Sequence, residues 1–364
     1  MSLPIIFNGR FLQRPVTGVE RFAIETLRAL DDLISAGEID IGPLCIAVPR
    51  GTRPQVEFTN LKVIEVGRWQ GYAWEQLELP WFAGRRLLVN LCNTGPVLKR
   101  HQAVVIHDAA VFSVPQAYGT AFKLVYKGMH RLLALRGAQI LTVSEFSRQE
   151  LARHLQLKPS AITVLPEGGE HVLRVQPDEG ILNKAGLRQR PFVLAVSSAQ
   201  ANKNFAFVAQ ALASLGDPGF DVVVAGGTNP AVFAAKGAPM PAFVKHVGYV
   251  SDGELASLYE HAACFVFPSL YEGFGIPPLE AMARGCPVVA STAASIPEVC
   301  GDAAVYFDPL DAQSFLNALN RVMGSETARV ELKVLAHQRS QLWTWPQAAR
   351  ALIKALPEQM LKNP

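Results

Sequence analysis

The stretch that decides the fold runs from residue 265 to residue 282 and reads FVFPSLYEGFGIPPLEAM. An apolar strand at its start leads into the loop Gly273-Phe274-Gly275, and this loop opens a helix whose first turn carries proline and then Glu280. Proline is tolerated at the first helical position because its missing N–H would have no partner there. Strand, glycine-rich loop and helix in this order are typical of a Rossmann-like α/β unit.

The same stretch carries a candidate binding site. The free N–H groups of a glycine-rich loop and of a helix N-terminus attract anions, and the helix dipole adds to this. Glu272 and Glu280 frame the loop and would be repelled by a bound phosphate, so we interpret them as acceptors for hydroxyls beside that phosphate. A nucleotide sugar, with its diphosphate between a sugar and a ribose, has these groups. The alternative is an ordinary capped helix, but the two glutamates around Gly-Phe-Gly favour a binding site.

Further along the chain follow ARGCPVVAS at 283–291 and IPEV at 296–299. From Phe265 to Pro309 the sequence resembles the donor-site signature of family 4 of the retaining glycosyltransferases, which have the GT-B fold. The resemblance implies an α/β protein of two Rossmann-like domains facing across a cleft, with a C-terminal helix that crosses back to the N-terminal domain. It also implies that the acceptor hydroxyl attacks on the face from which the diphosphate departs.

The rest of the chain is consistent with two such domains. Its 364 residues suggest about two domains on length alone. Strand-like and helix-like runs alternate from Pro4 onward, a Gly- and Pro-containing stretch follows at Pro166–Arg190, and the alternation restarts at Phe192. We expect an N-terminal acceptor domain over 1–170, a C-terminal donor domain over 171–342, and a helix over about 343–364 that returns to the first domain. The cleft between the domains is the expected active site.

Three residues outside the central stretch are also candidates. Lys203 follows the first strand of the second domain and could neutralise the leaving diphosphate, although a Lys-Asn pair there is also a common solvated cap. His107 ends the expected strand Ala103–Asp108 and resembles the family's histidine near the donor sugar; the alternative is a core histidine. Gly18 resembles the family's glycine that approaches the diphosphate, or is a turn residue. We therefore expect catalytic roles for Glu272, Lys203 and His107, and donor binding by Gly18, Lys203, Glu272, Gly273, Phe274, Gly275 and Glu280.

Two departures from the family pattern keep alternatives open. Relatives usually place an arginine beside the lysine, whereas the candidate positions here hold Ser197, Ser198 and Asn202. Relatives also have Pro-Asn-Gly where this chain has LPEGG at 165–169. A nucleotide-sugar 2-epimerase of the same fold and a non-catalytic sugar-nucleotide-binding subunit therefore remain alternatives to the transferase.

The sequence also bears on cofactors and location. It contains no Asp-x-Asp that would hold a metal on a diphosphate, so we expect a metal-independent enzyme without a cofactor beyond its donor substrate. The five cysteines form no Cys-x-x-Cys pair and fit reduced, buried thiols. No signal peptide and no apolar run of about 18 residues is evident. We expect a cytoplasmic protein with no nucleic-acid partner.

The expected substrates follow from the resemblance, which extends to bacterial mannosyltransferases of polysaccharide and O-antigen (lipopolysaccharide) biosynthesis. We expect GDP-mannose as donor and a glycan or a lipid-linked sugar as acceptor. Residues 1–175 hold 20 Lys and Arg against 15 Asp and Glu, a net charge of +5. The expected helix Tyr118–Leu135 adds a basic row of Lys123, Lys127 and Arg131. Peripheral contact with the inner membrane and an ordinary sheet-covering helix both explain this row.

Overall fold

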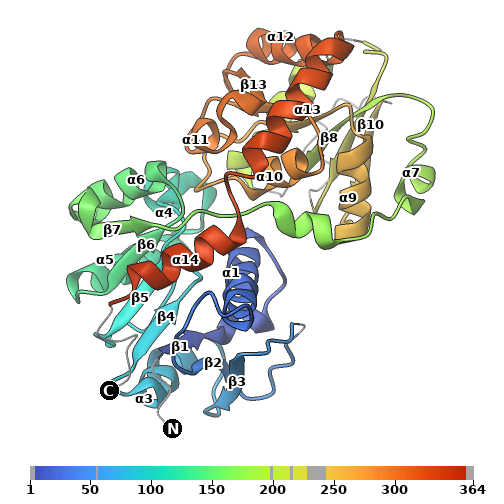
Figure 1. The fold of residues 1–364 in the computed structure, drawn as a ribbon. Helices are drawn as coiled ribbons and strands as arrows, with labels where there is room; N and C mark the ends of the chain where they lie inside the picture. Colours follow the sequence, from blue (N-terminus) through green and yellow to red (C-terminus); the bar gives the residue numbers. More distant parts are fainter. Residues whose placement is uncertain (1–4, 55, 197–199, 214–215, 228–242, 358–364) are drawn as a thin grey trace. The chain divides into compact units, whose positions relative to one another are not determined.

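The computed structural model describes residues 5–54, 56–196, 200–213, 216–227 and 243–357. The chain forms two compact units. Unit 1 comprises residues 1–167 and 345–364, and unit 2 comprises residues 168–344. Each unit is built around its own parallel sheet (Figure 1). The chain returns to unit 1 at Trp345, within the stretch of about 343–364 where the returning helix was expected.

Unit 1 has a seven-stranded sheet in the order β3-β2-β1-β4-β5-β6-β7, in which every described pairing is parallel. The strands read as apolar runs because helices cover the sheet and bury both faces. Strand order reverses between β1 and β4, which makes this the switch point where ligands of open α/β sheets bind. The strands are β1 (Ile5–Asn8), β2 (Leu44–Pro49), β3 (Leu61–Val66), β4 (Leu87–Asn90), β5 (Gln102–Val105), β6 (Gln139–Thr142) and β7 (Ile162–Val164).

The helices of unit 1 include one from the far end of the chain. Figure 1 shows α14, in the red of the last residues, beside the blue α1. Trp345 at the start of α14 is buried and meets the ring of Phe22 edge-on at 6.1 Å. The α-helices are α1 (Gly18–Ser35), α2 (Gly71–Ala73), α3 (Leu79–Ala83), α4 (Ala110–Ser113), α5 (Thr120–Leu135), α6 (Glu145–Leu155) and α14 (Trp345–Ala355). A π-helical turn, Trp74–Glu78, joins α2 to α3, and short 3₁₀ turns are η1 (Gly9–Gln13), η3 (Pro115–Ala117) and η4 (Pro159–Ala161).

Unit 2 has a six-stranded parallel sheet in the order β10-β9-β8-β11-β12-β13, with its switch point between β8 and β11. The strands are β8 (Phe192–Val196), β9 (Asp221–Ala225), β10 (Val244–Gly248), β11 (Cys264–Phe267), β12 (Val288–Ser291) and β13 (Ala304–Phe307). The α-helices are α7 (Gly180–Lys184), α8 (Phe205–Ala213), α9 (Asp252–His261), α10 (Ile276–Ala283), α11 (Ile296–Cys300), α12 (Ala312–Met323) and α13 (Glu326–Ser340). The 3₁₀ turns are η5 (Glu170–Arg174), η6 (Ala201–Lys203) and η9 (Gly301–Ala303).

Two local expectations differ from the structure, and the structure also shows which side chains of α5 are buried. The strand expected over Ala103–Asp108 ends at Val105, because the His107 amide donates to the Asn93 side chain instead of to a neighbouring strand. The helix α10 begins at Ile276, so its prolines occupy the second and third helical positions rather than the first. On α5, expected to be either a membrane-contacting or a sheet-covering helix, Met129 and Leu133 are buried in the core while other apolar side chains are not. Five of its apolar side chains are exposed, namely Phe122, Leu124, Val125, Leu132 and Leu135.

Among the described residues, every helix is too short or too polar to cross a membrane.

The packing of α14 on unit 1 gives a stability prediction. Trp345 is 1% exposed, so Trp345→Ala should lower the free energy of unfolding of unit 1 by about 3–5 kcal/mol. The matched control is Trp81→Ala in the same unit, whose side chain is 86% exposed and should matter little. Urea unfolding followed by circular dichroism measures both. Equal midpoints for the two variants would show that α14 does not stabilise unit 1.

Candidate active site

The loop between β11 and α10 is held in one shape by hydrogen bonds from two serines. The Ser291 hydroxyl donates to the Ser269 carbonyl at 2.6 Å. The Ser295 hydroxyl lies 3.0 Å from the Glu272 carbonyl and 2.8 Å from the Phe274 carbonyl, and so donates to this pair of oxygens. Gly275 has φ of 119°, a region that side-chain-bearing residues rarely adopt. The protein's own hydrogen bonds therefore hold the loop in this shape.

The start of α10 has fewer backbone N–H groups than the sequence suggested. Pro277 and Pro278 follow Ile276 in the first turn of α10 and have no N–H. The amides at this end of the helix are consequently those of the predicted residues Gly273, Phe274 and Gly275, together with Ile276. The Phe274 ring is part of the core, because the residue is 3% exposed and its ring packs edge-on against Trp343 at 5.4 Å. Only the backbone of Phe274 is therefore a candidate for ligand contact.

Lys203 and Glu272, both predicted from the sequence, meet in the structure. The Lys203 ammonium lies 2.7 Å from a carboxylate oxygen of Glu272, and the two side chains are 22% and 14% exposed. Asn202 fixes this approach, because its carbonyl accepts from the Leu270 amide at 2.7 Å and its side-chain amide donates to the Tyr271 carbonyl at 3.1 Å. A partly buried lysine and carboxylate at the end of adjacent strands form a charged site at the switch point of unit 2.

Asn202 is one of the three positions at which relatives could place the arginine that this chain lacks. Of the three candidate positions, it is the one that the structure describes, and its side chain holds the Glu272 loop. Ser197 and Ser198 lie outside the described residues.

Glu280 is held from two sides by residues that the sequence analysis did not select. Nε2 of His171 lies 2.9 Å from one carboxylate oxygen, and the Tyr259 hydroxyl donates to the other at 3.0 Å. Burial raises the pKa of Tyr259 well above its ordinary value, and the charge of Glu280 adds to the rise, so the phenol keeps its hydrogen. No sequence signal marked His171 or Tyr259, because each lies far from Glu280 along the chain.

In unit 1, Gly18 is the first residue of α1. The helix start is closed by Thr17 and Glu20, since the Thr17 amide donates to the Glu20 carboxylate at 3.3 Å and the Thr17 hydroxyl also bonds to it. A Cβ at Gly18 would meet no described atom within 4 Å. The space beside Gly18 is therefore open, and nothing in unit 1 itself requires a glycine there.

His107 was expected to point into a cleft, but its side chain is buried and both ring nitrogens are engaged. Nδ1 lies 3.2 Å from a carboxylate oxygen of Glu167, and Nε2 lies 2.9 Å from the Leu91 carbonyl. Both partners offer acceptor oxygens, so this geometry favours the doubly protonated form of the ring, which donates from both nitrogens. Burial alone would lower the pKa of His107, but the hydrogen bond and charge of Glu167 and the Leu91 carbonyl outweigh it and raise that pKa. The structure thus places His107 in the core of unit 1, with each ring nitrogen next to an acceptor of that unit.

A second buried charge pair lies at the switch point of unit 1. Glu75 is fully buried and its carboxylate lies 3.2 Å from the Arg10 guanidinium. Asn8 and Thr94 donate to the other oxygen at 2.8 Å and 2.7 Å. The guanidinium stacks over the half-exposed ring of Tyr72, 4.3 Å from its centroid. Sequence reasoning missed this cluster because Glu75 lies in the π-helical turn, which has no distinct sequence pattern.

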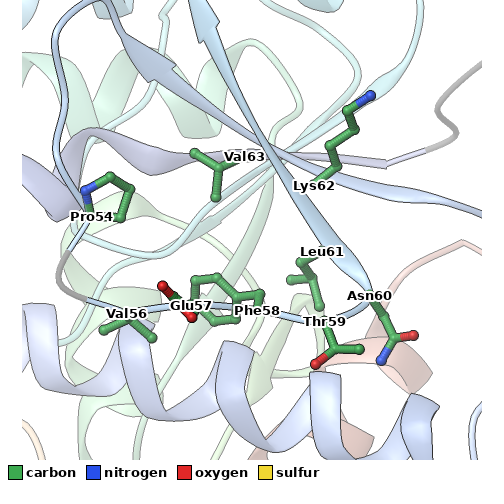
Figure 2. Close-up of a pocket in the computed structure, with 9 residues that line it drawn as sticks. All are labelled: Pro54, Val56, Glu57, Phe58, Thr59, Asn60, Leu61, Lys62 and Val63. Atoms are coloured by element: carbon green, nitrogen blue, oxygen red, sulfur yellow. The ribbon is translucent and has the colours of Figure 1, made fainter.

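One hollow on the described surface of unit 1 is unrelated to these residues. It has a volume of about 650 Å³ and is lined by residues 54 and 56–63, along the loop before β3 and the strand itself (Figure 2). β3 is the edge strand of unit 1, and the sequence-predicted site residues all lie elsewhere. We therefore place the chemistry at the two switch points and not in this hollow.

Comparisons with known proteins agree with this geometry. The family model described as "Glycosyl transferases group 1" matches residues 179–339. The chain is 29% identical over 261 residues to O-antigen chain mannosyltransferase B of Escherichia coli, covering 68% of each chain. It is 25% identical over 334 residues to O-antigen chain mannosyltransferase RfbU of Salmonella typhimurium, covering 87% of this chain and 90% of that protein.

Solved structures show the same fold. WaaG, a glycosyltransferase involved in lipopolysaccharide biosynthesis, superimposes with a TM-score of 0.70 at 16% identity, over 97% of this chain and 99% of that one.

The pair of His107 and Glu167 predicts a pH dependence of stability. Because the folded-state pKa of His107 is raised above 6.5, the pair stabilises fully below that pH and loses its contribution as the pH rises through the folded-state pKa. The urea midpoint of the wild type should therefore fall between about pH 6 and about pH 9 more steeply than that of His107→Gln, which has no such group to titrate. Parallel curves for the two proteins would show that His107 does not carry this charge.

Proposed function

This chain belongs to the group 1 glycosyl transferases, the family 4 type with the GT-B fold, and we propose that it is a retaining mannosyltransferase of O-antigen polysaccharide synthesis. It would move mannose from GDP-mannose to a glycan or lipid-linked acceptor on the cytoplasmic side of the inner membrane. The names of the two curated relatives support mannose and the O-antigen. The observation that carries the proposal is the 2.7 Å pair of Lys203 and Glu272 at the switch point of unit 2.

The donor roles follow from the chemistry of each group. Lys203 is the cation at the loop and would neutralise the diphosphate, helped by the Gly273–Gly275 amides. Glu272 accepts hydrogen bonds and would take those of the mannose hydroxyls. Glu280 is one turn into α10, held by donors on both oxygens, and would accept from the ribose hydroxyls. Each carboxylate oxygen has two lone pairs, so a protein donor and a ligand hydroxyl can share one oxygen.

The proposed reaction forms one bond and breaks one at the anomeric carbon. The acceptor oxygen bonds to that carbon on the face from which the diphosphate oxygen leaves, and the acceptor proton passes to the departing diphosphate. Lys203 stabilises the charge that develops on the diphosphate, the role for which electrostatic preorganisation is most effective. We propose that this lysine takes the place of a divalent cation.

Unit 1 would bind the acceptor. Its switch point holds Arg10 and Glu75 with the half-exposed Tyr72 beside them. Aromatic faces and charged hydrogen-bonding groups of this kind suit a sugar ring. His107, buried with an acceptor beside each ring nitrogen, would support this unit's part of the site through its position.

Mannosyl transfer tests the proposal directly. We expect the purified protein to transfer mannose from radiolabelled GDP-mannose to lipid-linked O-antigen precursors, and to do so equally well in EDTA. Lys203→Met should lower kcat by about 100-fold or more, the loss typical of one transition-state donor. The control is Lys245→Met in the same unit, because Lys245 pairs with Asp221 at 2.7 Å outside the Glu272 loop and should leave transfer intact.

The two alternatives give different results in this assay. A 2-epimerase would convert free UDP-N-acetylglucosamine in the absence of acceptor. A binding subunit would retain the nucleotide sugar without releasing nucleotide. Either result, or full transfer by Lys203→Met, would contradict the proposed roles.

We also propose that α5 contacts an anionic membrane surface. Leu124 and Leu135 are 69% and 82% exposed, and Phe122, Val125 and Leu132 extend this apolar face. The basic side chains Lys123, Lys127 and Arg131 lie on the same helix, and Arg136 follows it. The helix buries Met129 and Leu133 in the core of unit 1, so the exposed apolar side chains form a second face that core packing leaves uncovered, which supports the membrane interpretation.

Vesicle binding tests this surface. The wild type should float with phosphatidylglycerol vesicles and not with pure phosphatidylcholine, and added salt should weaken binding. Leu124→Glu with Leu135→Glu should abolish flotation. The control pair is Val330→Glu with Val334→Glu on α13, which are 57% and 55% exposed. Equal flotation of the α5 variant and the control would contradict the proposal.

A further inference from the structure

The chain that leaves unit 1 is attached to α10 before unit 2 begins its sheet. Gly169 packs so closely on α10 that a Cβ there would lie 2.7 Å from Leu279. Arg284, just past the end of α10, donates to the Val172 carbonyl and, at 2.5 Å, to the Val175 carbonyl. Its side chain is 8% exposed. The turn η5 is thus fixed along the same helix that carries Glu280.

His171 lies inside this fixed turn and reaches Glu280. Its side chain is 5% exposed, and Nε2 lies 2.9 Å from the Glu280 carboxylate. An ionised carboxylate only accepts hydrogen bonds, so Nε2 carries the hydrogen and donates it. The Tyr259 hydroxyl donates to the other oxygen. One donor on each oxygen fixes the plane of the carboxylate, and loss of the His171 hydrogen bond would remove one of these two constraints.

We propose that His171 is a positioning residue for ribose recognition: it orients the Glu280 carboxylate toward the hydroxyls of the donor's ribose without touching the donor. This inference rests on the proposed function, in which Glu280 receives those hydroxyls. Removing the His171 hydrogen bond removes a charge-assisted bond to a partly buried carboxylate, and such bonds have roughly twice the strength of neutral ones. The consequence is specific, because only contacts to the ribose hydroxyls depend on how that carboxylate is turned.

Nucleotides with and without ribose hydroxyls separate this role from a general structural one. Isothermal titration calorimetry would compare GDP with 2′,3′-dideoxy-GDP, and UDP with its dideoxy form in parallel. The wild type should prefer the ribonucleotide. In His171→Phe the affinity for the ribonucleotide should fall about tenfold while that for the dideoxy form stays the same, so the preference collapses. His171→Gln, whose side-chain amide can donate to Glu280, should restore most of it.

The control is His337→Phe on α13, whose ring bonds to Gln341 and which should keep the wild-type preference. An equal loss of affinity for both nucleotides in His171→Phe, or an unchanged preference, would overturn the positioning role. A wild type that binds nucleotides but does not prefer ribose would overturn the assignment of Glu280, and the inference with it. A wild type that binds neither GDP nor UDP would contradict the proposed function itself. These last two results appear in the wild type, so they are distinguishable from a failure of His171.

Discussion

The ion pair of Lys203 and Glu272 joins residues that are 69 positions apart in the sequence, and it exists because β8 and β11 are neighbours in a parallel sheet. Parallel strands end at the same edge, so the segments that follow these two strands are brought side by side. The Leu270 amide and the Asn202 carbonyl then join the two segments directly. The order of the strands thus brings Lys203 and Glu272 together. The turn at Gly275 and the Ser295 hydroxyl then fix the local shape of the loop that carries Glu272.

The same pair shows how a charged site can exist without its ligand. A partly buried lysine or carboxylate alone would be costly, and each group here offsets the other's charge. In the proposed reaction the diphosphate replaces Glu272 as the partner of Lys203, and the sugar hydroxyls replace Lys203 as the partner of Glu272. Each charged group therefore exchanges one partner for another. Unit 1 uses fixed pairs instead. His107 with Glu167 and Arg10 with Glu75 are buried pairs held inside the unit, which suits groups that orient others.

The sequence predicted much of the fold and the donor loop, because both depend on local patterns. Alternating strands and helices predicted two parallel α/β units, and the GFG loop with its two glutamates predicted the region of unit 2 where Lys203 and Glu272 meet. Residues whose roles depend on distant partners could not be found in this way. Glu167 meets His107 across 60 positions, and His171 meets Glu280 across 109.

The sequence also did not predict which face of a helix, or which side chain at a strand end, is buried. The apolar and basic sides of α5 were evident from its spacing, but which side faces the core depends on packing. Lys127 and Arg131 both lie over the ring of Phe112, at 5.4 Å and 5.5 Å from its centroid, and Arg131 is nevertheless exposed, so these two residues lie at the border of the buried face. Likewise, the position of His107 after a strand does not reveal that its side chain is buried. The contacts with Asn93, Leu91 and Glu167, all distant in sequence, hold it in the core.

The segment Glu167–His171 has the composition of a plain connecting loop, yet its first residue bonds to His107 in unit 1 and its last bonds to Glu280 in unit 2. Loops between domains usually tolerate insertions, because their length matters little to the parts they join. Here three residues, at 168–170, lie between the two anchors. The length of chain that is free to bend between the two units is therefore very short.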